Sequence, residues 1–120
     1  MRKPEALLAT RVANYLKENH PEIIYRFDIA ADVPLPPAHA KRNLELHGKW
    51  NRGYPDLLIC KKTKKYGGLY LELKATKKVL NSEHTRRQAV YHELLRKAGY
   101  KVLFTCGFDE STGAIRKYLS

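Results

Sequence analysis

The spacing of apolar residues predicts two amphipathic helices. Residues 4–18 and residues 83–98 repeat apolar side chains every three or four positions, which is the period of one helix face. Pro4 suits the first turn of its helix, because the N–H that proline lacks would have no partner there. Gly99 can end the second helix, since glycine readily adopts the left-handed conformation of a helix cap.

Shorter apolar runs predict strands. They cover residues 23–30, 55–60, 68–74 and 101–107. Gly67 and Gly68 stand where the third run begins and predict a turn that leads into it, because glycine tolerates positive φ. The order helix, three strands, helix, strand predicts an α/β fold in which helices flank a mixed β-sheet, written αβββαβ.

Two further segments lie outside this core pattern. Residues 38–52 are basic and fit a short helix followed by a loop. Residues 109–119 fit a short terminal helix, an appendix to the core. The length of 120 residues fits a single domain, residues 1–120.

Charged residues stand inside two of the predicted strands. Strand side chains alternate, so Glu72 and Lys74 share one face of their strand, opposite its leucines. If residues 56–60 pair with this strand through the turn, Asp56 lies near Glu72. Neighbouring carboxylates repel unless a cation joins them, and Mg²⁺ prefers oxygen ligands. The pattern indicates a divalent metal site; a simple salt bridge between Glu72 and Lys74 is the alternative.

Each predicted helix also carries one polar residue inside its apolar stripe. On a wheel of 100° per residue, Glu5 lies about 60° from Leu8, and Gln88 lies about 60° from Tyr91. Buried polar groups need partners, so both residues are candidates to join the site. For Glu5 the alternative is solvation near the start of the chain.

The net charge of the chain indicates the kind of partner that it binds. Lys and Arg together number 23 against 12 acids, a formal net charge of +11, which favours a polyanionic partner such as nucleic acid. A solvated basic surface is the alternative. No run of 18 apolar residues and no secretion signal is present, and Cys60 and Cys106 form no Cys-x-x-Cys pair. These features predict a cytoplasmic protein, bacterial or phage-encoded, with reduced cysteines and no membrane partner.

Together these residues resemble a known signature. Pro55-Asp56, fifteen residues, and then Glu72-Leu73-Lys74 resemble the motif of PD-(D/E)XK nucleases, whose restriction-endonuclease-like core has a similar element order. The run Gly53-Tyr54-Pro55-Asp56-Leu57, followed by Gln88, more narrowly resembles the VRR-NUC family of virus-type replication-repair nucleases. The resemblance covers the chain from Glu5 to about Cys106 and implies a stand-alone domain.

The resemblance implies a metal-dependent DNA endonuclease. Asp56, Glu72 and the main-chain carbonyl of Leu73 would ligate Mg²⁺ or Mn²⁺. The implied substrate is branched DNA, such as a four-way (Holliday) junction, and the implied assembly is a homodimer.

The resemblance also implies three supporting roles. Lys74 would position the attacking water and support its deprotonation. Gln88 would hold that water or Lys74 in place. Glu5 would lie at the rim of the metal site.

Basic side chains outside the site are candidates for phosphate contacts, which release counterions. They are Lys61, Lys62, Lys64, Lys65, Lys77, Lys78, Arg86 and Arg87. Two other functions compete with the metal nuclease. One is a non-catalytic nucleic-acid-binding module that retains the charge. The other is a His-Asn-His-like nuclease that uses His39, Asn43 and His47, although their spacing and strand context fit it poorly.

Overall fold

The computed structural model describes residues 3–28, 35–77 and 82–120. The described residues form, in chain order, α1 (Lys3–Asn19), β1 (Tyr25–Phe27), α2 (Pro37–His47), the 3₁₀ turn η2 (Gly48–Asn51), β2 (Leu57–Ile59), β3 (Leu69–Lys74), α3 (Glu83–Lys97), β4 (Lys101–Cys106) and α4 (Gly107–Leu119).

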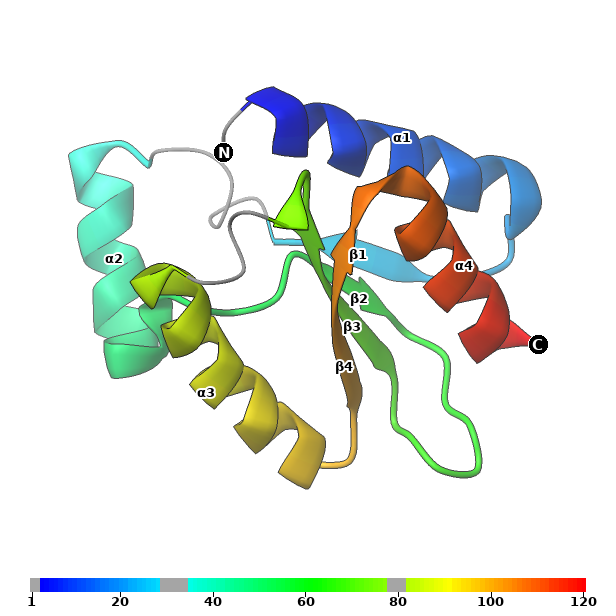
Figure 1. Ribbon diagram of the computed structural model, residues 1–120. Coiled ribbons are helices and arrows are strands. Elements are labelled where there is room, and N and C mark those ends of the chain that lie inside the picture. Colours follow the sequence, from blue (N-terminus) through cyan, green and yellow to red (C-terminus); the bar gives the residue numbers. More distant parts are fainter. Residues whose placement is uncertain (1–2, 29–34, 78–81) are drawn as a thin grey trace.

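The strands form one mixed sheet in the order β1-β2-β3-β4 (Figure 1). β2 pairs antiparallel with both β1 and β3, whereas β3 and β4 are parallel. A parallel pair needs a crossover, and α3 supplies it. Leu57 lies opposite Leu71 in the β2–β3 pair. The start of β2 and the end of β3 therefore lie at the same end of the sheet.

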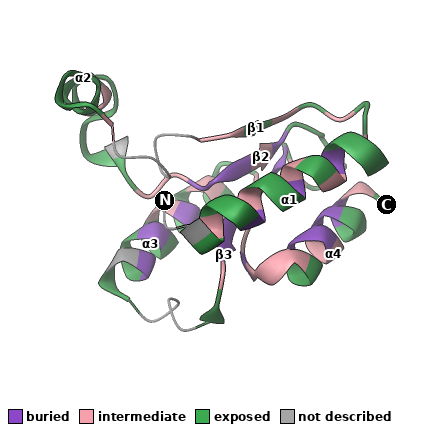
Figure 2. Cartoon of the chain, turned by 90° about the horizontal axis from the view of Figure 1, so that it is seen from above, coloured by how far each residue is buried: buried purple, intermediate pink, exposed green. Residues whose placement is uncertain are grey.

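Helices cover both faces of this sheet. The core cluster lies between α1, α4 and one sheet face, and it includes Val12, Leu71 and Ile115, each 0% exposed. The buried positions recur along the sides of α1, α3 and α4 that face the sheet, whereas α2 stands apart (Figure 2). No described residue of α2 is buried.

The predicted fold class is confirmed, with three differences in detail. β1 has three residues, and part of the run predicted for it lies outside the described residues. The segment after the prolines forms the helix α2 and then η2 in place of a loop. The predicted terminal helix forms as α4, from Gly107 to Leu119, but its description as an appendix is wrong, because Ile115 and Tyr118 are buried in the core.

Candidate active site

Asp56 lies just before β2, beside the end of β3. It precedes Leu57, so the antiparallel register places it opposite Glu72. Its side chain is 4% exposed, and Oδ2 accepts a hydrogen bond of 2.8 Å from the Leu73 N–H. The main chain is held as well, because the Asp28 N–H donates to the Asp56 carbonyl at 2.8 Å. The structure thus places Asp56 directly across the β2–β3 pair from Glu72.

Glu72 and Lys74 share the face of β3 that α3 covers. Both are 4% exposed, and Lys74 Nζ lies 3.8 Å from Glu72 Oε2. The closer partner of Lys74 is Gln88, whose Oε1 accepts a bond of 3.0 Å from Nζ. The separation of 3.8 Å exceeds that of a charge-assisted hydrogen bond. The ion pair between Glu72 and Lys74 that was the alternative to a metal site is therefore present, and it is a long one.

The first turn of α3 positions Gln88. Ser82 caps the helix, since its Oγ accepts a hydrogen bond of 3.0 Å from the Thr85 N–H. Thr85 and Gln88 are both buried one turn apart, so this side of α3 faces the sheet. Gln88, the polar residue predicted within the apolar stripe of this helix, is therefore buried and contacts Lys74.

His92 belongs to the same surroundings, and the sequence analysis missed it. Its side chain is 0% exposed, its Nε2 lies 3.8 Å from Glu72 Oε1, and its ring lies 4.6 Å from that of Phe104. Neither ring nitrogen has a hydrogen-bond partner among the described residues. Burial lowers the pKa of His92 to about 4, helped by the charges of Arg96 and Lys74. His92 follows Gln88 by one helical turn, and this spacing was the available signal.

Tyrosines close the sheet face next to these charges. Tyr54 and Tyr70 join their hydroxyls at 2.6 Å, and the Tyr91 ring lies 5.8 Å from that of Tyr54. Burial and the hydrogen bond with Tyr54 raise the pKa of Tyr70. Gly53 has a φ of 89°, and a Cβ there would lie 3.3 Å from the Tyr91 ring. A glycine is therefore required three residues before Asp56.

The donor set fits a hard divalent cation. With both carboxylates ionised, Asp56 and Glu72 carry two negative charges against the single positive charge of Lys74, because His92 is neutral at pH 7. Carboxylate and carbonyl oxygens are the ligands that Mg²⁺ and Mn²⁺ prefer. Among the described residues, no group of three or more His, Cys, Asp or Glu side chains could hold a metal. A cation bound here would therefore also need main-chain, water or substrate oxygens.

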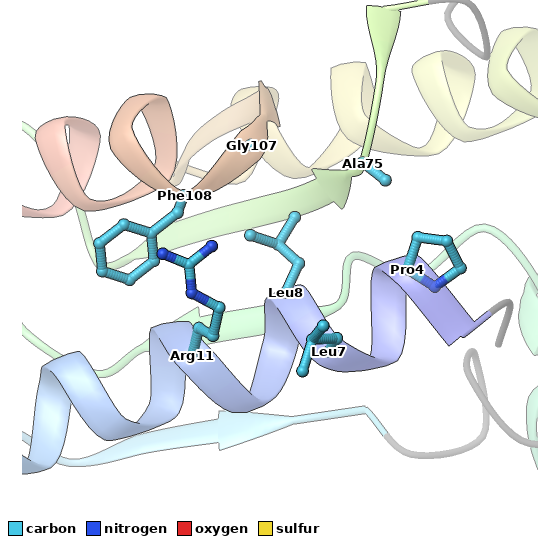
Figure 3. Close-up of a pocket in the computed structure, with 7 residues that line it drawn as sticks. All are labelled: Pro4, Leu7, Leu8, Arg11, Ala75, Gly107 and Phe108. Atoms are coloured by element: carbon cyan, nitrogen blue, oxygen red, sulfur yellow. The ribbon is translucent and has the colours of Figure 1, made fainter.

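Glu5 lies on the first turn of α1 and is half-buried. Pro4 and Leu8, on either side of it in sequence, line a pocket together with Ala75 (Figure 3). Ala75 directly follows Lys74, so this turn of α1 lies beside the end of β3. The structure thus places Glu5 close to the region where its role was predicted.

The predicted phosphate contacts fall into two groups. Lys77, Arg86 and Arg87 are exposed and flank the site in sequence, next to the end of β3 and the start of α3. The four lysines of the β2–β3 loop are exposed at the opposite end of β3. They are Lys61, Lys62, Lys64 and Lys65. Six strand residues span roughly 17 Å, so phosphates bound by this loop would lie about that far from the site. Lys78 lies outside the described residues.

His39, Asn43 and His47 lie one turn apart on α2. His47 Nδ1 lies 2.9 Å from Asn43 Oδ1, so two of the three side chains contact each other along the helix. This is a local helical interaction, and it adds no support to the interpretation as a His-Asn-His-like nuclease.

The described residues define an α/β protein with two buried acids and a lysine where β2 begins and β3 ends. No family model matches the sequence, and no curated protein matches it either. Among solved structures the chain is similar to a "VRR_NUC domain protein", with a TM-score of 0.70 and 22% identity over 99% of this chain and 90% of that one. The chain therefore has the fold of that protein, and the predicted resemblance is confirmed at the level of fold. No described helix has both the length and the apolar character needed to span a bilayer.

Proposed function

We propose that the protein is a nuclease that uses Mg²⁺ or Mn²⁺ to hydrolyse phosphodiester bonds in DNA. One observation carries this proposal: a chain with the fold of a VRR_NUC domain protein buries Asp56, Glu72 and Lys74 together at one end of two neighbouring strands. Buried charges are costly, and such clusters are typical of functional sites. The net charge of +11 supports a polyanionic substrate.

The two acids would hold the cation together with the main-chain carbonyl of Leu73. The bound cation would supply Lewis-acid stabilisation of the negative charge that develops on the phosphoryl group. The hydrogen bond from the Leu73 N–H holds the Asp56 carboxylate in position before any substrate binds. Such preorganisation reduces the free energy otherwise spent on reorienting the group during the reaction.

Lys74 would orient the attacking water. An ammonium has three donors, and Gln88 accepts one of them at 3.0 Å, so the remaining two can point to water and to a phosphate oxygen. The positive charge also makes deprotonation of that water less costly. Gln88 would act by fixing Lys74, and Glu5 would lie at the rim of the metal site.

We further propose a branched substrate and a homodimeric assembly. A small domain with many basic groups reads DNA shape and backbone charge more readily than a long base sequence. Two symmetry-related subunits suit the two cuts of a four-way junction. α2 is a candidate interface, because none of its described residues is buried and it exposes Leu44 and Leu46. The C-terminal tail is a weaker candidate, since α4 packs into the core. A DNA substrate is compatible with the cytoplasmic location predicted from the sequence.

The test is a cleavage assay on linear duplex, flap and four-way DNA with Mg²⁺, Mn²⁺, Ca²⁺ or excess EDTA. We expect cutting with Mg²⁺ or Mn²⁺, little turnover with Ca²⁺, and a preference for four-way DNA. Full activity in EDTA would rule out the metal dependence. DNA binding without cleavage under every condition would favour the non-catalytic binding module.

Light scattering at micromolar concentration tests the assembly. We expect the mass of a dimer. A monomer that cuts linear and four-way DNA equally would end the proposal on junctions and dimers, and it would leave the nuclease proposal standing.

A further inference from the structure

A pocket of about 160 Å³ adjoins the candidate site (Figure 3). Its walls come from the first turns of α1, from Ala75 after β3, and from the start of α4. Figure 3 shows the side chains of Leu8 and Arg11 on the side of α1 that faces Ala75 and Phe108. The pocket is therefore formed by three segments that are distant in sequence.

The described residues that line this pocket combine apolar surface with one cation. Leu7, Leu8 and Phe108 supply the apolar surface, and Leu7 remains 62% exposed at the pocket. The cation is Arg11, whose guanidinium carbon lies 4.3 Å from the centroid of the Phe108 ring. Because the guanidinium covers the Phe108 ring, a flat ring that enters the pocket would stack on the outer face of the guanidinium, whose charge also attracts a nearby negative group.

The position of the pocket connects it to the reaction. Ala75 follows Lys74, and Gly107 follows Cys106, the β4 residue opposite Lys74. The pocket thus lies at the carboxyl ends of two parallel strands, where α/β sheets commonly bind ligands. Side chains alternate along a strand, so Ala75 faces the side of the sheet opposite to Lys74. A DNA strand that crosses the end of β3 would therefore pass close to both the site and the pocket.

We propose that this pocket binds one unpaired nucleobase of the nucleotide next to the scissile phosphate, and that Arg11 contacts the backbone phosphate of that nucleotide. This inference rests on the proposed nuclease function. A cavity of about 150 Å³ can hold a benzene ring, so a pocket of this size accommodates a single base ring. Stacking on an arginine guanidinium tolerates any base, because every base has a π-face.

The pocket would make cleavage depend on DNA structure without base-specific contacts. A base inside a stacked duplex must first leave the stack, which opposes binding, whereas an unpaired base at a fork or junction is already available. Substrates with an unpaired nucleotide beside the cut would therefore be preferred over linear duplex. Arg11 and Phe108 would be determinants of specificity outside the metal site.

The test measures affinity for a forked DNA in Ca²⁺, so that binding is separated from cleavage. Two forks are compared, one with a base and one with an abasic site at the single unpaired nucleotide. We expect the parent protein to bind the fork with the base about tenfold more tightly, within the usual range for one stacked base. Arg11→Ala removes the stacking surface and the cation, so it should abolish this difference and weaken binding of both forks. Phe108→Leu removes the ring that the guanidinium packs on, and it should reduce the difference.

Arg116→Ala is the matched control, because Arg116 is exposed on α4 and does not line the pocket. Circular dichroism and melting temperature verify that each variant is folded. Equal affinity of the parent for the two forks, or a difference that survives in Arg11→Ala, would overturn the pocket. Loss of affinity with Arg116→Ala as large as that with Arg11→Ala would overturn the role of Arg11. A parent that prefers the base but never cuts DNA in Mg²⁺ would retain the pocket and contradict the nuclease instead.

Discussion

The two ends of the β2–β3 hairpin carry charge in opposite ways. At one end Asp56, Glu72 and Lys74 are each 4% exposed. At the other end the four lysines of the loop are exposed to solvent; they are Lys61, Lys62, Lys64 and Lys65. An exposed ammonium keeps its hydration, whereas a buried charge loses it and must find partners in the protein or in a ligand. Both ends of the hairpin contain charged residues in the sequence. Burial in the structure separates the charged residues of the candidate site from those of the solvated loop.

The loop end is held by neutral hydrogen bonds in place of ionic ones. The Tyr118 hydroxyl donates to the Lys61 carbonyl at 2.6 Å, and Thr63 Oγ1 accepts a bond of 2.9 Å from the Tyr66 N–H. Burial raises the pKa of Tyr118, so its hydroxyl stays a donor at neutral pH. These bonds order the loop through main-chain, tyrosine and threonine groups, and the exposed lysine side chains add charge.

The largest expected effect comes from breaking the buried end. Lys74→Ala should lower the cleavage rate by roughly 10²-fold or more while DNA binding stays nearly intact, the scale of general acid–base assistance. Asp56→Asn should do at least as much by weakening cation binding. The measurement is single-turnover cleavage of four-way DNA. Lys64→Ala, an exposed lysine at the loop end, is the matched control and should cut at the parent rate. Parental cleavage by Lys74→Ala or Asp56→Asn would refute the site.

A smaller loss should follow when only the partner of Lys74 is removed. Gln88→Leu deletes the acceptor at 3.0 Å and keeps much of the side-chain volume. We expect a loss of about 10- to 100-fold in cleavage, the range for groups that orient residues around a metal site. Thr85→Val is the matched control, because Thr85 is another buried polar residue of α3 and lies one turn before Gln88. An equal loss in both variants would indicate that disturbed packing of α3, and not the bond to Lys74, causes the effect.

His92 should make the stability of the buried end depend on pH. Its pKa is about 4 in the folded protein and about 6.5 when unfolded, so between these values the unfolded chain binds more protons. The free energy of unfolding should therefore fall as pH decreases from 6.5 to 4, by at most about 3 kcal/mol from this group. Urea unfolding at several pH values measures the slope. His92→Phe should flatten the dependence of the unfolding free energy on pH. His39→Phe is the control, because His39 is exposed on α2, and it should leave the slope unchanged. Equal slopes in the parent and both variants would show that His92 is not the cause of the pH dependence.

The smallest effect is expected from the loop end. Replacing Lys61, Lys62, Lys64 and Lys65 together with glutamine should leave the cleavage rate at saturating DNA unchanged. If the loop contacts DNA, the slope of log affinity against log salt becomes shallower, because fewer counterions are released. An unchanged slope would show that this end does not touch DNA and that the substrate stays near the buried end.

Local sequence patterns were sufficient to predict the sheet face of the site. Alternation along residues 69–74 separated the leucines from Glu72 and Lys74, and the structure packs the two sets on opposite faces. The turn and the strand lengths were sufficient to bring Asp56 opposite Glu72. The helical wheel was sufficient to mark Gln88. These predictions needed only the periods of strands and helices, which are properties of neighbouring residues.

By itself the sequence determined the α/β class, the two faces of β3 and the acids that are candidates for binding a cation. Only the tertiary structure decided which polar groups meet them. His92 enters the site because the crossover lays α3 across β3 and β4, and α4 joins the core because Ile115 and Tyr118 find the leucine face already formed. The same packing left the loop lysines a full strand length from the acids. Such distances depend on how elements pack, and local periodicity carries no information about them.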